Sequence, residues 1–494
     1  MQARCSTTKD DGSLKQPFMK LKVRFKLERL HPTLSIIVPA AVRWIPEAQF
    51  PYPIGFDTPW YLASAKLYAE SLQPFPLLYF ILGRLCNVGI DPLISMKIMP
   101  TVLYGLLGLS TFLLARRTFM WSSWKSLILV LAVALSPAML RASWDLNKQA
   151  LALIFFISSL SLLRSLRSLR SAAAFIILSV LTSMSHELIY GLMTAVYILL
   201  ALNVIFRVFK GEEADLKKIS TLLLSIGLSS TVFIGFWYGW NFKALAASTM
   251  NVGVTTSTTA LWPEKFTQLF LFYNVGLIPL AILGFFRNEV AIAWLIAAAV
   301  GSFSIILPPR ITISIPERWF ILIAYPIAVF AANSVSRLRL NSPKPEKAAL
   351  TIALILLCNS FSLPLLGLSA WPSIIRGPEG YVPTCMASSS IPLSDIEATR
   401  KLIAEINQTG KSVLITHIVY AGWVKYFNPQ IPLIAFAEWY STMQTAAKAL
   451  EAAKTWGYSK IYLLWYVENE ARELSFKKIS GEGGLSLYTY AGSD

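Results

Sequence analysis

Long apolar stretches alternate with short basic ones along the first three quarters of the chain. The apolar stretches cover residues 34–42, 93–115, 127–140, 150–163, 172–184, 188–206, 219–240, 270–286, 291–307, 319–335 and 350–368. Several of them approach the roughly 20 residues that a helix needs to cross a bilayer. The pattern predicts a polytopic α-helical membrane protein with about eleven transmembrane helices.

Residues 50–90 do not follow this pattern, although they lie between the first two predicted spans. Trp60, Ser64, Leu67 and Tyr68 fall on one helical face of this stretch, and Arg84 interrupts its short apolar part. An amphipathic helix of this kind lies along a membrane surface rather than across it. We therefore expect residues 50–90 to form surface helices in the first loop on the outer side.

Near residue 380 the pattern changes again. Strand-like segments at 412–417, 460–466 and 485–490 alternate with helix-like segments at 394–407 and 439–456. Such alternation is typical of an α/β layer domain, in which we expect 485–490 at the edge of the sheet. The predicted organisation is a basic N-terminus (1–29), a transmembrane domain (30–370) and an α/β domain (380–494).

Composition and charge agree with a membrane protein. The 494 residues are 55% hydrophobic and 14% charged, whereas soluble domains carry roughly 25% charged residues. The net charge of +17 could suggest nucleic acid, but the basic residues sit in short stretches between apolar runs, so we exclude a nucleic-acid partner. The positive-inside rule then places the N-terminus in the cytoplasm and the α/β domain outside, in a multi-pass protein of the cell membrane.

Ionisable residues near membrane depth are costly and are therefore candidates for function. On the predicted outer side these are Asp57, Arg141, Asp145, Lys148, His186, Glu187, Arg310, Glu317 and Arg318. If the helices form a bundle, their outer ends can converge on one cavity. Four cysteines and three histidines are scattered through the chain, so no Cys/His metal site is predicted.

Asp57 is the sharpest candidate, and it stands in the segment GFDTPWY. It could serve only as a helix cap. Thr58 can take that role with Pro59 at the first helical position, which would leave the Asp57 carboxylate free.

Each remaining candidate has a structural alternative. Asp145 opens a predicted helix, so it is either an N-cap or part of a site. His186 and Glu187 occupy a tight turn, where a polar pair can simply be solvated. Arg318 begins a span in IPERWF, where it either reaches toward lipid headgroups or binds an anionic phosphate.

The order of these features resembles the GT-C superfamily of polyprenyl-phosphate-sugar-dependent glycosyltransferases, in particular archaeal-type relatives of protein mannosyltransferases and aminoarabinose transferases. The resemblance rests on PYPIGFDTPWY, PFPLLYFILGRL, KIMPTVLYGLLGLSTFLLARR, LSPAMLRASWDLNKQALALIFF, LTSMSHELIYGL and IPERWFILIAYPIA, which cover most of the membrane region in order.

The resemblance implies a role for each candidate. Asp57 corresponds to the catalytic base of the first outer loop, and Asp145, with Glu187 behind it, corresponds to a second contributing acid. Arg318 corresponds to the arginine that contacts the donor phosphate. Further candidate substrate-binding residues are Arg141, Lys148, His186 and Arg43, which ends the first span.

The implied reaction moves a sugar from a polyprenyl phosphate in the membrane to an extracytoplasmic protein, lipid or glycan, with inversion at the anomeric carbon. A carboxylate base and preplaced cations suit this chemistry. Asp57 stands alone in FDT, not in a DxD pair, so the need for a divalent cation is left open. Two alternatives are a transporter or flippase, which would show internal repeats, and a non-catalytic scaffold with an outer binding domain.

Overall fold

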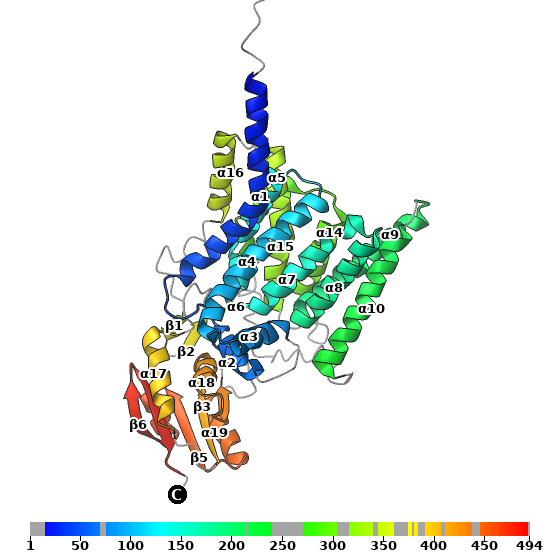
Figure 1. Cartoon of the computed structure of the whole chain (residues 1–494). Coiled ribbons are helices and arrows are strands. Elements are labelled where there is room, and N and C mark those ends of the chain that lie inside the picture. Colours follow the sequence, from blue (N-terminus) through cyan, green and yellow to red (C-terminus); the bar gives the residue numbers. More distant parts are fainter. Residues whose placement is uncertain are drawn as a thin grey trace, which may run out of the picture.

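A bundle of long helices carries a small mixed sheet at one end (Figure 1). The structure is a computed structural model, and it describes residues 15–69, 76–212, 215–239, 270–271, 273–303, 316–338, 344–359, 374–377, 380–383, 391–406, 411–436 and 445–492. Two shorter helices, α2 (Thr58–Ala69) and α3 (Leu77–Asn87), lie across the end of the bundle that faces the sheet.

The bundle is a multi-pass membrane domain, as the apolar pattern predicts. Its helices are α1 (Lys15–Glu47), α4 (Pro92–Arg117), α5 (Ser123–Ala134), α6 (Pro137–Asp145), α7 (Asn147–Leu160), α8 (Leu169–Ser185), α9 (Glu187–Phe209), α10 (Leu216–Tyr238), α13 (Ile278–Gly284), α14 (Glu289–Phe303), α15 (Pro316–Arg337) and α16 (Pro345–Cys358). Within the described residues, five helices are long and apolar enough to cross a membrane, or six when one bent pair counts as a span. The predicted number of eleven is therefore not confirmed.

The bent pair is α5 and α6, which turn by 64° where a single span is predicted. The side chain of Ser136 accepts a hydrogen bond from the amide of Met139, and Pro137 follows as the first residue of α6. A serine N-cap followed by proline starts a new helix, because proline lacks the N–H that would continue the previous one. The bend gives α6 its own direction, and α6 ends at Asp145.

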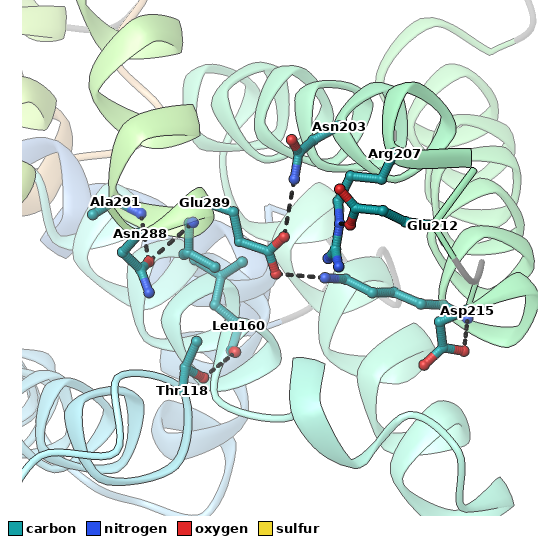
Figure 2. Close-up of polar contacts among 11 residues, drawn as sticks. Thr118, Leu160, Asn203, Arg207, Glu212, Asp215, Asn288, Glu289 and Ala291 are labelled. Atoms are coloured by element: carbon teal, nitrogen blue, oxygen red, sulfur yellow. Dashed lines mark hydrogen bonds and ion pairs between the residues drawn. The ribbon is translucent and has the colours of Figure 1, made fainter. Parts of the chain in front are cut away.

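Polar contacts fasten the bundle at the end away from the sheet (Figure 2). There Lys218 forms an ion pair of 2.5 Å with Glu289, which also accepts a hydrogen bond of 3.1 Å from Asn203. Arg207 pairs with Glu212 nearby. These contacts join α9, α10 and α14. The Arg207–Glu212 pair is exposed, and exposed pairs contribute about 0–1 kcal/mol each.

The C-terminal domain holds a five-stranded sheet with the order β4-β3-β5-β7-β6. Its strands are β3 (Ser412–His417), β4 (Leu433–Phe436), β5 (Lys460–Trp465), β6 (Phe476–Glu482) and β7 (Leu485–Tyr490), and its helices are α17 (Leu393–Ala404), α18 (Ile418–Phe427), α19 (Ala446–Thr455) and α20 (Glu468–Glu473). Before it, β1 (Ile374–Gly377) and β2 (Gly380–Pro383) form an antiparallel pair. Strand β3 pairs in parallel with β4 and β5, whereas β7 pairs antiparallel with β5 and β6.

The α/β prediction is confirmed, but the edge position of 485–490 is wrong. Strand β7 lies between β5 and β6, and β6 is the edge strand on that side. The side chains of β6 are largely exposed, so its sequence lacks the apolar pattern that indicates a strand. Helix α18 is also absent from the sequence prediction, because it follows β3 without a loop and His417 itself caps it.

Candidate functional site

A cavity of about 190 Å³ opens where α2, α3 and the ends of the bundle helices meet. It is lined by Asp57, Trp60, Tyr61, Tyr79, Leu146, Lys148, His186 and Arg318. These residues come from the loop before α2, from α2 and α3, from the α6–α7 and α8–α9 junctions and from the start of α15. Four of the predicted site residues, Asp57, Lys148, His186 and Arg318, therefore share one cavity.

The loop between α1 and α2 (residues 48–57), here called the Asp57 loop, leads directly into α2. The amides of Trp60 and Tyr61 donate to the Asp57 carbonyl at 3.1 and 3.2 Å, while the Thr58 hydroxyl donates backward to the Ile54 carbonyl at 2.5 Å. The expectation that Thr58 caps α2 is wrong, because the Asp57 backbone takes that position. Among the described residues no hydrogen bond reaches the Asp57 carboxylate, which is therefore available to the cavity.

Two opposing influences set the protonation of Asp57. Burial raises the pKa of its carboxyl group most, and the negative charge of Asp145 raises it further. Arg318, Arg141 and Lys148 lower it, and the balance is a pKa of about 6. An acid with this pKa is mostly ionised at neutral pH, yet it binds a proton much more readily than an ordinary aspartate.

Asp145 lies behind the Asp57 loop rather than in the cavity lining. Its Oδ1 accepts a hydrogen bond of 2.8 Å from the amide of Phe56, and its Oδ2 forms an ion pair of 2.6 Å with Nε of Arg141. The alternative in which Asp145 is an N-cap is wrong. It is the last residue of α6, and α7 begins at Asn147 without a side-chain cap.

Glycine is required at position 55 for the loop to come this close to α6. Gly55 has a φ of +107°, and a Cβ placed there would lie 2.2 Å from the carbonyl oxygen of Trp144. L-residues with a side chain rarely adopt such a φ, and no real Cβ approaches an oxygen so closely. The glycine in GFDTPWY thus allows the loop to dock beside Asp145.

Two cationic side chains and one histidine line the cavity together with Asp57. Lys148 lies on α7 with its ammonium 5.0 Å from the centre of the Tyr79 ring, and Arg318 lies in the first turn of α15. The Nδ1 of His186 accepts a hydrogen bond of 3.1 Å from the amide of Leu188 and so caps α9. Burial, then Lys148 and Arg318, lowers the pKa of His186 well below its usual value, so the ring is neutral and carries its proton on Nε2.

Arg43 and Glu187 are not among the residues that line the cavity. Arg43 is fully buried, pairs with Glu47 at 2.7 Å and donates to the Ser143 carbonyl at 3.1 Å. Glu47 in turn accepts from the amide of Ile54 at 3.2 Å, so this pair supports the Asp57 loop from behind. Glu187 occupies the first turn of α9. Arg310 and the Glu317 side chain lie outside the described part of the chain.

Four lining residues, Trp60, Tyr61, Tyr79 and Leu146, were not predicted from the sequence. The Tyr61 hydroxyl accepts from the amide of Lys148 at 3.3 Å and donates to the Asp145 carbonyl at 3.4 Å. The aromatic doublet that follows FDTP was the available signal, but helical periodicity alone placed Trp60 only on one face of a helix that lies along the membrane surface. Aromatic rings beside a few polar groups are typical of ligand pockets.

The side chains that line the cavity do not form a metal centre by themselves. Asp57 and His186 are the metal-ligating side chain types in the cavity lining, and Lys148 and Arg318 stand beside them. Within the described residues there is no group of three or more His, Cys, Asp or Glu side chains placed to hold a metal ion.

Comparisons with known proteins define the class of fold. No protein-family model matches the chain, and no curated protein matches it by sequence. Among solved structures it is similar to the Archaeoglobus fulgidus oligosaccharyltransferase in complex with Zn and sulfate, with 12% identity, a TM-score of 0.55 and coverage of 87% of this chain and 68% of that one. It is also similar to ArnT from Cupriavidus metallidurans bound to undecaprenyl phosphate, with 10% identity, a TM-score of 0.56 and coverage of 93% and 98%.

A third similar structure is the arabinofuranosyltransferase AftD from Mycobacteria, with 14% identity and a TM-score of 0.52. This chain spans 40% of its length, while 93% of this chain is covered. All three are membrane glycosyltransferases, so the chain has the GT-C fold that the sequence resemblance implies.

Proposed function

We propose that the protein is a glycosyltransferase that moves a sugar from a polyprenyl-phosphate donor to an acceptor hydroxyl. One observation carries the proposal. The Asp57 carboxylate, without a hydrogen-bond partner among the described residues, shares a cavity of about 190 Å³ with two cations, Lys148 and Arg318. The similarity to ArnT bound to undecaprenyl phosphate supports the choice of donor.

In this proposal Asp57 is the general base. It takes the proton of the acceptor hydroxyl as the acceptor oxygen bonds to the anomeric carbon. The bond from that carbon to the phosphate oxygen breaks, and the phosphate leaves with the electron pair. A positioned base contributes typically 10²–10⁴-fold to the rate, and a single displacement inverts the anomeric configuration.

Lys148 and Arg318 hold the donor phosphate. Their charges are in place before the reaction, which is the arrangement that best stabilises a leaving group as it becomes more negative. Arg141 is engaged by Asp145 at 2.6 Å, so we assign it to the support of the Asp57 loop. Trp60 and Tyr79 provide apolar ring faces for the sugar.

We place the cavity and the C-terminal domain on the extracytoplasmic side. The basic stretches between α7 and α8 and between α9 and α10 lie at the opposite end of the bundle from the sheet (Figure 1). Because basic loops remain in the cytoplasm, this arrangement puts the N-terminus of the chain inside and the acceptor, whether protein, lipid or glycan, outside.

The two alternatives make different demands. A flippase needs two alternative openings around one site, and a scaffold needs no ionised acid beside two cations in a cavity. Burying the Asp57 carboxylate next to that of Asp145 costs free energy. A transferase explains why the protein bears this cost, because it uses the Asp57 carboxylate as a base.

The deciding experiment supplies the purified protein in lipid with a panel of polyprenyl-phosphate sugars and follows sugar release or transfer by mass spectrometry. Asp57→Asn should abolish turnover, while Asp215→Asn, an acid at the other end of the bundle, should retain it. If the folded wild-type protein turns over none of the donors, the result would contradict the proposal and favour a scaffold. Donor translocation without a covalent product would favour a flippase.

A further inference from the structure

The C-terminal domain contacts the surface helices mainly through α18, which packs along α2 (Figure 1). The hydrophobic core is continuous across this boundary, since Tyr61 and Leu62 of α2 belong to the same cluster as Tyr420 and Trp423 of α18. Tyr420 and Trp423 are both 0% exposed. The outer domain is therefore not loosely tethered, and its position is coupled to that of α2.

Gly422 marks the closest approach between the two helices. A Cβ at this position would lie 2.7 Å from Cβ of Pro59 and 3.0 Å from the backbone nitrogen of Trp60. Glycine inside a helix is unfavourable by roughly 0.5–1 kcal/mol relative to alanine. Here the missing side chain is what lets α18 rest on the first turn of α2, the turn that carries Trp60 and Tyr61 into the cavity.

The same turn is fixed from the opposite side. The amide of Phe56 donates to Asp145, and the Tyr61 hydroxyl contacts the backbone of Asp145 and Lys148. The first turn of α2 is thus held between α18 of the outer domain and the α6–α7 junction of the membrane domain. A shift of α18 toward α2 has to be absorbed by the cavity wall between them.

Lys66 of α2 and Tyr52 of the loop before α2 make further contacts with α18 and with α17. The ammonium of Lys66 donates to the Tyr426 carbonyl at 2.7 Å and lies 4.2 Å from the centre of that ring. The ring of Tyr52 packs edge-on against Trp423 at 5.4 Å, and its hydroxyl donates to Glu397 of α17. These contacts hold the part of α18 that follows Gly422, and the neighbouring α17, against α2 and the loop before it.

We propose that Gly422 is a positioning residue, through which α18 sets the place of Trp60 and hence the width of the cavity for the donor sugar. The inference rests on the proposed function for its consequence in catalysis, but the geometric coupling can be tested without turnover. It gives the C-terminal domain a role in the site of the membrane domain.

The kinetic test compares Gly422→Ala with Gly227→Ala. Gly227 is also helical, but nothing lies within 4 Å of a Cβ placed there. Gly422→Ala should raise the KM for the donor at least ten-fold with a smaller change in kcat, and Gly227→Ala should change neither. Adding Pro59→Gly removes the first atom that the new methyl group meets, so the double variant should recover part of the lost donor affinity. Unchanged kinetics in Gly422→Ala, or no recovery in the double variant, would overturn the inference.

The test without turnover uses Trp60→Cys in a background in which Cys5, Cys86, Cys358 and Cys385 are replaced by serine. The rate at which a small water-soluble thiol reagent modifies this cysteine reports the exposure of the cavity wall. Adding Gly422→Ala should change that rate at least three-fold, and an unchanged rate would overturn the inference. If Gly422→Ala does not fold, Lys66→Met, which removes the hydrogen bond to Tyr426, replaces it in both tests.

The two measurements separate failure of the inference from failure of the proposed function. A changed labelling rate in a protein that turns over no donor contradicts the transferase and supports the positioning role. Normal turnover with an unchanged labelling rate supports the transferase and overturns the positioning role.

Discussion

The carboxylate of Asp145 holds the amide of Phe56 at 2.8 Å, one residue before Asp57. The same carboxylate pairs with Arg141 at 2.6 Å, and its charge raises the pKa of Asp57. Asp145 therefore acts on Asp57 in two ways, through the position of the loop and through charge. This arrangement differs from the direct catalytic role that the family resemblance implies for Asp145, and the two roles can be separated by substitution.

Asp145→Asn should retain turnover, because an asparagine oxygen can still accept the hydrogen bond from Phe56. The variant loses the negative charge that raises the pKa of Asp57, so the acidic limb of its pH–rate profile should move to lower pH. Asp145→Ala removes the acceptor as well and should lose at least ten-fold in kcat. The check is kcat/KM against pH for both variants. Complete loss of turnover in Asp145→Asn would instead make Asp145 a catalytic residue.

The pH dependence of the wild-type protein should report Asp57. A general base works only when it is ionised, so kcat/KM should rise with pH up to about 6, the pKa of Asp57, and level off above it. Profiles measured with donors of different reactivity should share this limb. A profile that is flat between pH 5 and 7 would show that Asp57 is not the group whose ionisation limits the rate.

Ionisation of the Asp57 carboxylate should lower the stability of the folded protein, although it raises the rate. Because folding raises its pKa from 3.8 to about 6, the folded state binds the proton more tightly than the unfolded state between these values. Stability should therefore fall as pH rises through this window. Asp57→Asn should lose less thermal stability than wild type between pH 4 and pH 6.5, as measured by Tm in detergent. A steeper loss in the variant would contradict the raised pKa.

Arg318 and Lys148 should govern affinity for the donor phosphate. A hydrogen bond to a charged group contributes about 1.5–3 kcal/mol, so Arg318→Ala and Lys148→Met should each raise the donor KM by about 10–100-fold. Arg318→Lys should be intermediate, because it keeps the charge but loses the two-pronged geometry of the guanidinium. Arg400→Ala, an exposed arginine on α17, is the matched control and should leave the donor KM unchanged.

Gly55→Ala should destabilise the protein and impair turnover together. The variant combines a φ of +107° with a Cβ 2.2 Å from the Trp144 carbonyl oxygen, and backbone strain alone costs about 1–3 kcal/mol. Gly89→Ala isolates that strain, because Gly89 has a φ of +86° but nothing within 4 Å of its Cβ position. Measuring Tm and kcat for both should show a larger loss of each in Gly55→Ala. Equal effects would mean that the contact with Trp144 is not important.

Much of the architecture follows from local sequence patterns. The apolar runs at 93–115 and 188–206 became α4 and α9, and the segment 412–417 became β3. Local patterns failed where the decisive contact is distant in sequence. Strand β6 is recognisable only by its pairing with β7, and Leu485–Tyr490 reads as an edge strand until that partner is known.

Only some residues of the candidate site could be predicted from local sequence patterns. Asp57, Lys148, His186 and Arg318 could be chosen from the sequence because ionisable groups at helix ends in a membrane protein are costly and thus conspicuous. Trp60 and Tyr79 carry no such signal, since aromatic residues are common at membrane interfaces for reasons unrelated to a ligand.

The sequence by itself determined the class of protein, because apolar run length and the placement of basic residues depend on the membrane as a solvent and not on tertiary contacts. It also determined which acids and cations stand at helix ends. Only the tertiary structure decided that Asp145 supports the Asp57 loop, that the Arg43–Glu47 pair lies behind this loop, and that Gly422 of the C-terminal domain rests on α2. The contacts that decide these points join Asp145 to Phe56, Arg43 to Ser143 and Gly422 to Pro59, across 89, 100 and 363 positions of sequence. Neither helical periodicity nor charge pattern carries information over such a separation.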